Sequence, residues 1–221
     1  MGKSDQQILA IKREHLFPEG IFQGFKSSKD IDYESRILNH MEFVRRGSTS
    51  EPENHPLGNA ELSKIYKQPI GYAILANISR KEVFAYKRAV QDKDYSEKRL
   101  QGKWSWGFGG HIEFSDNQKG NPIRESMIRE VTREELEIFG KINEIIPLGY
   151  INDELDSVGR VHFGILYLIN TNATRVEPKD KEAEIVEPKK LIGLEELCNS
   201  TDCEVESWSR IALDSLRRIL K

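Results

Sequence analysis

The sequence predicts an α+β protein that combines a β-sheet with packed helices and carries an N-terminal extension. Paired apolar runs at 69–77 and 82–90 are typical of a β-hairpin, and further apolar runs follow at 145–151 and 161–169. Amphipathic segments at about 122–137 and 204–220 are typical of helices packed against a sheet. With 221 residues, of which 38% are hydrophobic, the chain can bury one large core.

The first 66 residues are expected to form an extension packed on a main domain of residues 67–221. Short strands are predicted at Ile8–Ile11 and Ile21–Phe25, around a turn that contains proline and glycine. A helix is expected from about Asp32 to Arg45. The segment 47–59, GSTSEPENHPLGN, has the composition of a loop.

The main domain opens with the hairpin PIGYAILAN and EVFAYKRAV, followed by a charged loop at 91–103. The segment 104–114, WSWGFGGHIEF, carries a double glycine. Asn121 and Pro122 predict a helix start, because asparagine caps free N–H groups and proline is tolerated in the first turn. The helix is expected to end near Glu137. A polar segment that contains Pro178 and Pro188 leads to helices near 194–198 and 204–220.

Charge and cysteine usage exclude several functional classes. A net charge of −3 gives no basic field, so a nucleic-acid polymer is not the expected partner. Cys198 and Cys203 lack the spacing of a zinc site or a disulfide framework. The apolar run Ile8–Ile11 is too short for a signal peptide or a membrane span, so no membrane role and a cytoplasmic location are expected.

The helix predicted at 122–137 places two carboxylates one turn apart. At about 100° per residue, Glu130 and Glu134 lie at the edge of an apolar stripe, and Arg129 and Arg133 point further toward solvent. Such a pair suits Mg²⁺ or Mn²⁺, which prefer oxygen ligands. An amphipathic helix with surface Glu–Arg pairs is the alternative.

The residues from Gly109 to Glu134 resemble the Nudix box, G-x5-E-x7-R-E-U-x-E-E-x-G-U, where U is aliphatic. GGHIE, Asp116 and the sequence REVTREE carry the likeness. A MutT-type bacterial branch of predicted phosphoesterases is similar also in its long N-terminal extension. The chain departs from the pattern in having Asp116 for Glu, a loop five residues longer, and Arg133 for the first Glu of the acidic pair.

The resemblance implies an α/β/α sandwich around a mixed β-sheet, and hydrolysis of a diphosphate bond in a nucleoside-diphosphate-linked or related metabolite. By likeness to the box, Glu130 and Glu134 hold Mg²⁺ (or Mn²⁺), together with a backbone carbonyl of Gly109 or Gly110. Arg129 orients the carboxylates. The substrate is a small diphosphate molecule, and a homodimer through the extension is an open alternative to a monomer.

Other roles stay open at the level of sequence. Glu182 is the first choice for the general base, with Glu184 and the acidic loop at Asp153, Glu154 and Asp156 as alternatives. Arg88 and Arg99 are candidates for phosphate contacts, although surface salt bridges fit them equally well. His111 and His162 sit in alternating strands, where a histidine held by a backbone partner is the favoured interpretation.

Arg133 favours fewer bound metals, because its charge would repel a second cation. It is also the best argument for the rival hypothesis, a Nudix-like module that binds and senses a nucleotide metabolite without cleaving it. Retention of both Glu130 and Glu134 favours the enzyme.

Overall fold

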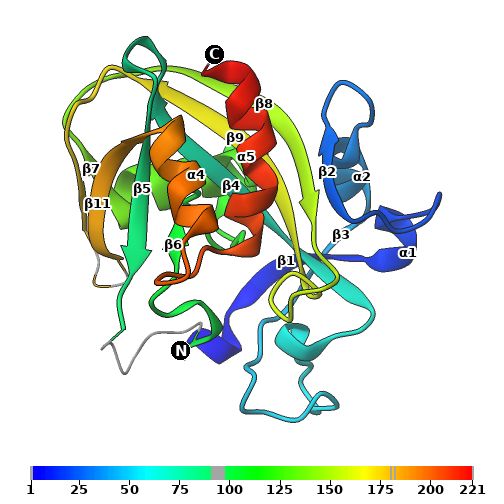
Figure 1. Ribbon diagram of the computed structural model, residues 1–221. Helices are drawn as coiled ribbons and strands as arrows, with labels where there is room; N and C mark the ends of the chain where they lie inside the picture. The colour runs from blue at the N-terminus through cyan, green and yellow to red at the C-terminus, as the bar shows by residue number, and fades with distance from the viewer. Residues whose placement is uncertain (1, 91–97, 180, 182, 221) are drawn as a thin grey trace. The chain divides into compact units, whose positions relative to one another are not determined.

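The computed structural model describes residues 2–90, 98–179, 181 and 183–220, and Figure 1 labels its elements. The helices are α1 (Arg13–Leu16), α2 (Tyr33–His40), α3 (Pro122–Arg129), α4 (Leu191–Asn199) and α5 (Ser207–Ile219), with a π-helical turn at Glu130–Glu135. The strands are β1 (Gln7–Lys12), β2 (Gly24–Ser27), β3 (Met41–Arg45), β4 (Tyr66–Asn77), β5 (Glu82–Arg88), β6 (Trp104–Ser105), β7 (Leu136–Ile138), β8 (Ile142–Asn152), β9 (His162–Thr171), β10 (Val176–Pro178) and β11 (Ala183–Lys190).

Nine of these strands form one sheet, whose main path runs β11-β5-β4-β9-β8-β2, while β10 pairs with β7 separately. The chain divides into two compact units. The first comprises Met1–Gly71, Gly110–Met127 and Gly149–Ile165, and the second comprises Tyr72–Gly109, Ile128–Leu148 and Leu166–Lys221. Strands β4 and β9 each begin in the first unit and end in the second.

In the first unit, β1 pairs antiparallel with β3, from Gln7↔Arg45 to Ile11↔Met41. The prediction of a helix as far as Arg45 is therefore wrong in its last five residues. Helix α2 begins at an Asp32 cap, whose carboxylate accepts the Ser35 N–H at 2.9 Å, and ends at His40. Pairing with β1 gives residues 41–45 backbone partners that a longer helix would not.

An aromatic cluster fills the core of the first unit. Tyr33 packs edge-on against Tyr150 and Phe163, with ring centroids 5.1 Å and 5.3 Å apart. Phe17 and Phe22 pack around the same rings. Full burial of such a ring stabilises a fold by about 1.5–3 kcal/mol, so this cluster anchors the extension to the strands of its own unit.

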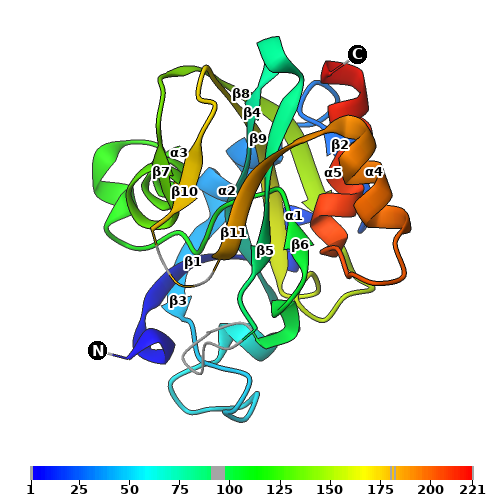
Figure 2. The same ribbon diagram turned by 60° about the vertical axis from the view of Figure 1, so that its left-hand side comes forward.

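In the second unit, β5 is the central strand and pairs antiparallel with β4, β6 and β11. The predicted hairpin of β4 and β5 is confirmed, and Lys81 closes it in the left-handed region at φ 53°. Helices α4 and α5 lie side by side in Figures 1 and 2. Strand β11 was not predicted, because it mixes apolar with charged residues and none of its side chains is buried, as suits a strand at the end of the sheet path.

The predicted start of α3 is confirmed. The Asn121 Oδ1 atom accepts the N–H groups of Ile123 and Arg124, at 3.0 Å and 3.3 Å. Ile123 and Met127 are fully buried on the predicted apolar stripe. Beyond Arg129, however, the backbone leaves α-helical geometry, and this change shapes the candidate site.

Candidate active site

The carboxylates that were predicted on an α-helix lie on a π-helical turn, Glu130–Glu135. A π turn closes i→i+5 hydrogen bonds in place of the i→i+4 bonds of an α-helix, so its side chains are spaced differently around the axis. The prediction of an α-helical backbone at these residues is therefore wrong, although Glu130 and Glu134 do come together.

Arg129 holds two of these carboxylates. Its Nη1 atom donates hydrogen bonds to Oε1 of Glu130 at 2.7 Å and to Oε1 of Glu134 at 3.0 Å. Arg129 is only 9% exposed, so the prediction that it points to solvent is wrong. The Glu130 side chain is 13% exposed and that of Glu134 is 51% exposed. The guanidinium therefore fixes one buried and one accessible carboxylate at a common point.

Glu135 is a further acidic residue of this site and was not among the residues predicted for it. Its Oε1 atom accepts the Gly109 N–H at 2.9 Å. Gly109 has φ 148°, in the region that favours glycine. The structure thus ties one of the two box glycines to the acidic turn through its N–H group. Gly110, the other glycine proposed as a carbonyl ligand, is the first residue of a segment of the other unit.

The π turn also accounts for Arg133. A π turn holds one residue more than an α turn, so Arg133 fits as an insertion, and Glu134 and Glu135 then form the adjacent acidic pair. The Arg133 side chain is exposed. In this interpretation, Arg133 does not replace a glutamate of the pattern.

The structure gives the two proposed phosphate-binding arginines different surroundings. Arg88 donates from Nε to Glu206 Oε1, and both side chains are largely buried, at 15% and 6% exposure. The salt-bridge alternative therefore describes Arg88. Arg99 lies on a short 3-10 turn, Lys98–Leu100, and is half-exposed.

Of the general-base candidates, Glu182 lies outside the described residues. Glu184 lies on β11, with Oε2 3.3 Å from the Lys87 Nζ atom. The acidic loop in the first unit has structural partners, because Asp153 accepts from Gln23 at 2.7 Å and Asp156 accepts the Val158 N–H at 2.7 Å.

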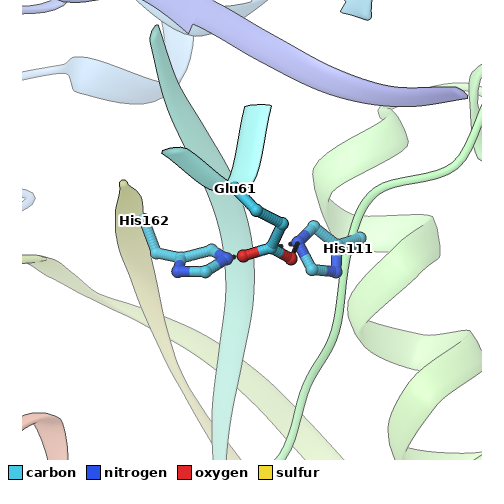
Figure 3. Close-up of side chains that lie close together, drawn as sticks. All are labelled: Glu61, His111 and His162. Carbon is cyan, nitrogen blue, oxygen red and sulfur yellow. Dashed lines mark hydrogen bonds and ion pairs between the residues drawn. The ribbon is translucent and has the colours of Figure 1, made fainter. Parts of the chain in front are cut away.

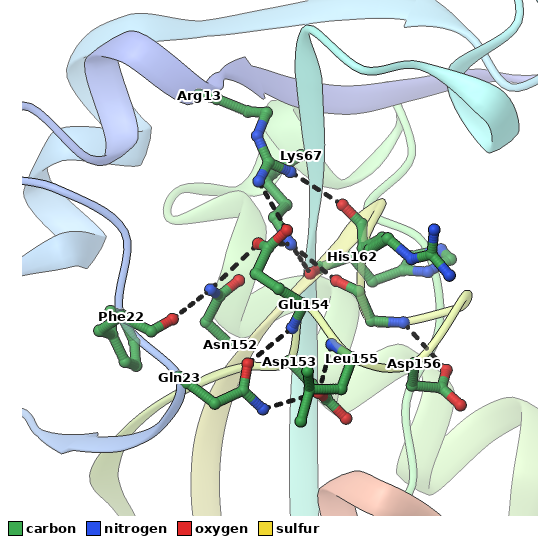
Figure 4. Close-up of polar contacts among 12 residues, drawn as sticks. Arg13, Phe22, Gln23, Lys67, Asn152, Asp153, Glu154, Leu155, Asp156 and His162 are labelled. Atoms are coloured by element: carbon green, nitrogen blue, oxygen red, sulfur yellow. Dashed lines mark hydrogen bonds and ion pairs between the residues drawn. The ribbon is translucent and has the colours of Figure 1, made fainter.

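Glu154 belongs to a buried charged network of the first unit (Figure 4). It accepts from Arg13 Nη2 at 2.7 Å and lies 2.8 Å from Lys67 Nζ. Burial lowers the pKa of Lys67 to about 8. Burial raises the pKa of Glu154, but the hydrogen bonds from Lys67 and Arg13 outweigh it, so the net shift is downward. The network holds the loop that follows β8.

His111 and His162 meet in the first unit, together with Glu61 (Figure 3). Their Nε2 atoms lie 3.2 Å apart, and His111 Nε2 lies 3.7 Å from Glu61 Oε1. The prediction that a backbone carbonyl holds a histidine is confirmed for His162, whose Nδ1 contacts Val158 O at 2.8 Å. The cluster itself could not be predicted, because its members are far apart in the sequence.

The solved structure of Tm1382, a protein assigned to the Nudix hydrolases, is similar to this chain over nearly its whole length. It shares 25% identity and a TM-score of 0.70, covering 97% of this chain and 100% of that one. The chain belongs to the Nudix hydrolase family. Protein YmaB of Bacillus subtilis (strain 168) is also similar to this chain, 32% identical over 224 residues that cover 98% of this chain and all of YmaB.

A Nudix hydrolase from Alicyclobacillus acidocaldarius has the same fold, with a TM-score of 0.52 and 11% identity over 68% of this chain and 90% of its own. No family model matches the sequence. The predicted Nudix-like α+β fold around a mixed sheet is confirmed, and hydrolase activity on a small molecule is supported. Among the described residues, no helix is long and apolar enough to span a membrane.

Proposed function

We propose that the protein is a Mg²⁺- or Mn²⁺-dependent hydrolase that cleaves a diphosphate bond in a nucleoside-diphosphate-linked or related metabolite. The observation that carries the proposal is the clamp of Arg129 on Glu130 and Glu134, beside a third carboxylate at Glu135. An ordinary surface ion pair would not need a buried arginine or a π turn to bring acids together.

The donor set fits a hard divalent cation. Glu130, Glu134 and Glu135 offer carboxylate oxygens, which Mg²⁺ prefers. Bound there, the ion would neutralise diphosphate charge and lower the pKa of a water molecule.

The chain's own residues prepare this site. Arg129 holds Glu130 and Glu134 in one orientation, so no conformational entropy is lost in aligning them when substrate arrives. The Gly109 N–H fixes Glu135 in the same way. Glu182 remains our proposal for the base that takes a proton from the attacking water, with Glu184 as the alternative. For phosphate contacts we favour Arg99 over Arg88, because Glu206 already engages Arg88.

The test is phosphate release from a panel of nucleoside diphosphate compounds, with Mg²⁺ or Mn²⁺. We expect turnover by the wild type, and a fall in kcat/KM of more than about 100-fold in Glu130→Gln and Glu134→Gln, since loss of a direct ligand should exceed loss of a supporting group. The matched control is Glu137→Gln, an exposed glutamate on β7 that should keep full activity.

One observation favours the alternative, a module that binds a nucleotide metabolite without cleaving it. Arg129 already pairs with the carboxylates of both Glu130 and Glu134 and offsets part of their charge, as a site with no metal would require. Tight binding of a compound by calorimetry, with no turnover of any compound in the panel under either metal, would select this alternative.

A further inference from the structure

A second cluster of potential ligands lies in the first unit and shares no residue with the acidic turn. Glu61 comes from the 3-10 turn Ala60–Leu62, His111 follows the double glycine, and His162 is the first residue of β9. Glu61 is 4% exposed, His162 is 5% exposed, and the His111 side chain is 14% exposed. In Figure 3 the Glu61 carboxylate and the two imidazole rings point toward one another.

Hydrogen bonds orient the His162 ring for metal binding. A carbonyl only accepts, so the contact between Nδ1 and Val158 O at 2.8 Å places the proton on Nδ1. The Nε2 lone pair of His162 then faces the cluster. A backbone carbonyl bonded to the outer nitrogen is the support that metal-binding histidines typically have.

Neighbouring groups also position His111 and Glu61. Gln68 donates from Nε2 to Ala60 O at 3.0 Å, so its Oε1 faces His111 Nε2, at 2.6 Å. Because an amide oxygen only accepts, His111 carries a proton on Nε2 in this arrangement, in which no metal is bound. Arg46 donates from Nε to Glu61 Oε1 at 3.0 Å and so fixes the carboxylate. The positive charge of Arg46 disfavours a nearby cation. However, the carboxylates that bind metals in proteins usually accept hydrogen bonds from neighbouring groups as well.

The separations match those of ligands on one small ion. Two nitrogens, each about 2.05 Å from a tetrahedral zinc ion, lie about 3.3 Å apart. The Nε2 atoms of His111 and His162 are 3.2 Å apart, and the Glu61 oxygen is 3.7 Å from His111 Nε2. One potential ligand atom of each of the three residues lies within 4.8 Å of the others.

We propose that Glu61, His111 and His162 bind a divalent transition-metal ion, with zinc as the preferred species. Two imidazoles and one carboxylate suit zinc or its neighbours, whereas Mg²⁺ prefers oxygen ligands alone. On binding, the His111 proton moves from Nε2 to Nδ1 by exchange with solvent, so that the imidazole stays neutral and both Nε2 lone pairs bond the ion. The ion links the turn at Glu61, the segment after the glycines and the start of β9.

This site is independent of the proposed hydrolytic function, because none of its ligands belongs to the acidic turn. Zinc binding should therefore be unchanged in Glu130→Gln. A Glu130→Gln variant that loses hydrolysis but still binds zinc would separate the two proposals, so either can fail without the other.

The test uses the full chain without an affinity tag, stripped with a chelator, then given zinc or cobalt salt and desalted. Metal content should be one ion per chain in the wild type, and bound Co²⁺ should show the visible absorption of a tetrahedral site. His162→Gln and Glu61→Gln should weaken zinc binding by more than about 100-fold. The control removes the exposed, stacked pair His15 and His40, and should bind zinc as the wild type does.

Because Glu61→Gln and His162→Gln alter buried residues, circular dichroism first establishes that each variant is folded. The zinc content of the wild type does not depend on either variant. The proposal is overturned if the wild type, after zinc is added to the stripped protein and the sample is desalted, retains no zinc. It is equally overturned if both folded variants retain as much zinc as the wild type.

Discussion

Replacing Arg129 with methionine should destabilise the acidic turn by an amount set by repulsion between two carboxylates. The Oε1 atoms of Glu130 and Glu134 bond the same nitrogen, so they lie no more than about 5.7 Å apart, the sum of 2.7 Å and 3.0 Å. At an effective dielectric of about 20, two unit charges at that distance repel by about 3 kcal/mol. Glu134 is half-exposed, and water screening lowers the expected loss to about 1–3 kcal/mol.

The assay is chemical unfolding of Arg129→Met and wild type, with a chelator or with Mg²⁺. With the chelator, the variant should be less stable by the amount above. Mg²⁺ should restore much of the loss, because a cation then takes the place of the guanidinium charge. Arg124→Met, an exposed change on α3, should alter the free energy of unfolding by less than about 0.5 kcal/mol. Equal stability of Arg129→Met and wild type in the chelator would refute the reasoning.

Three further predictions concern residues outside the acidic turn. Burial lowers the pKa of Lys67 to about 8 from an ordinary 10.5. Between pH 8 and pH 10.5 the unfolded chain therefore binds more protons than the folded chain, and the free energy of unfolding should rise with pH. The rise should be about 3 kcal/mol larger in the wild type than in Lys67→Met. A stability difference between the two proteins that does not change with pH would contradict this. Gly107→Ala should lower the free energy of unfolding by about 3 kcal/mol, because the new Cβ would lie 1.9 Å from the ring of buried Tyr72; an unchanged denaturation midpoint would exclude the clash. Arg88→Met should cost about 3–5 kcal/mol in a denaturant titration, since it leaves the Glu206 carboxylate buried without its guanidinium, whereas a change confined to KM would favour a phosphate contact instead.

Local burial made much of the fold predictable from sequence. The strands β4, β5 and β9 are nearly continuous apolar runs, and Asn121 as an N-cap predicts the start of α3. Strand β3 was missed because residues 41–45 have no strong alternation, and only pairing with β1 makes them a strand. Long-range pairing of this kind overrides local propensity.

The candidate site was predictable in composition and less so in geometry. Residues Arg129, Glu130 and Glu134 do come together, as predicted. The π turn was not foreseeable from a periodicity that assumes 3.6 residues per turn, so the place of Glu135 was missed. The meeting of Glu61 with His111 and His162 depends on tertiary structure alone, since it joins segments about 50 residues apart along the chain.

Binding of Mn²⁺ to the wild type and to a Glu130→Gln/Glu134→Gln double variant, followed by the electron paramagnetic resonance of free Mn²⁺, tests the acidic turn most directly. We expect saturable binding to the wild type and a loss of affinity of more than about 100-fold in a double variant that remains folded. Equal Mn²⁺ binding by both proteins, or none by the wild type in the presence of a nucleoside diphosphate compound, would contradict a metal-dependent centre on this turn.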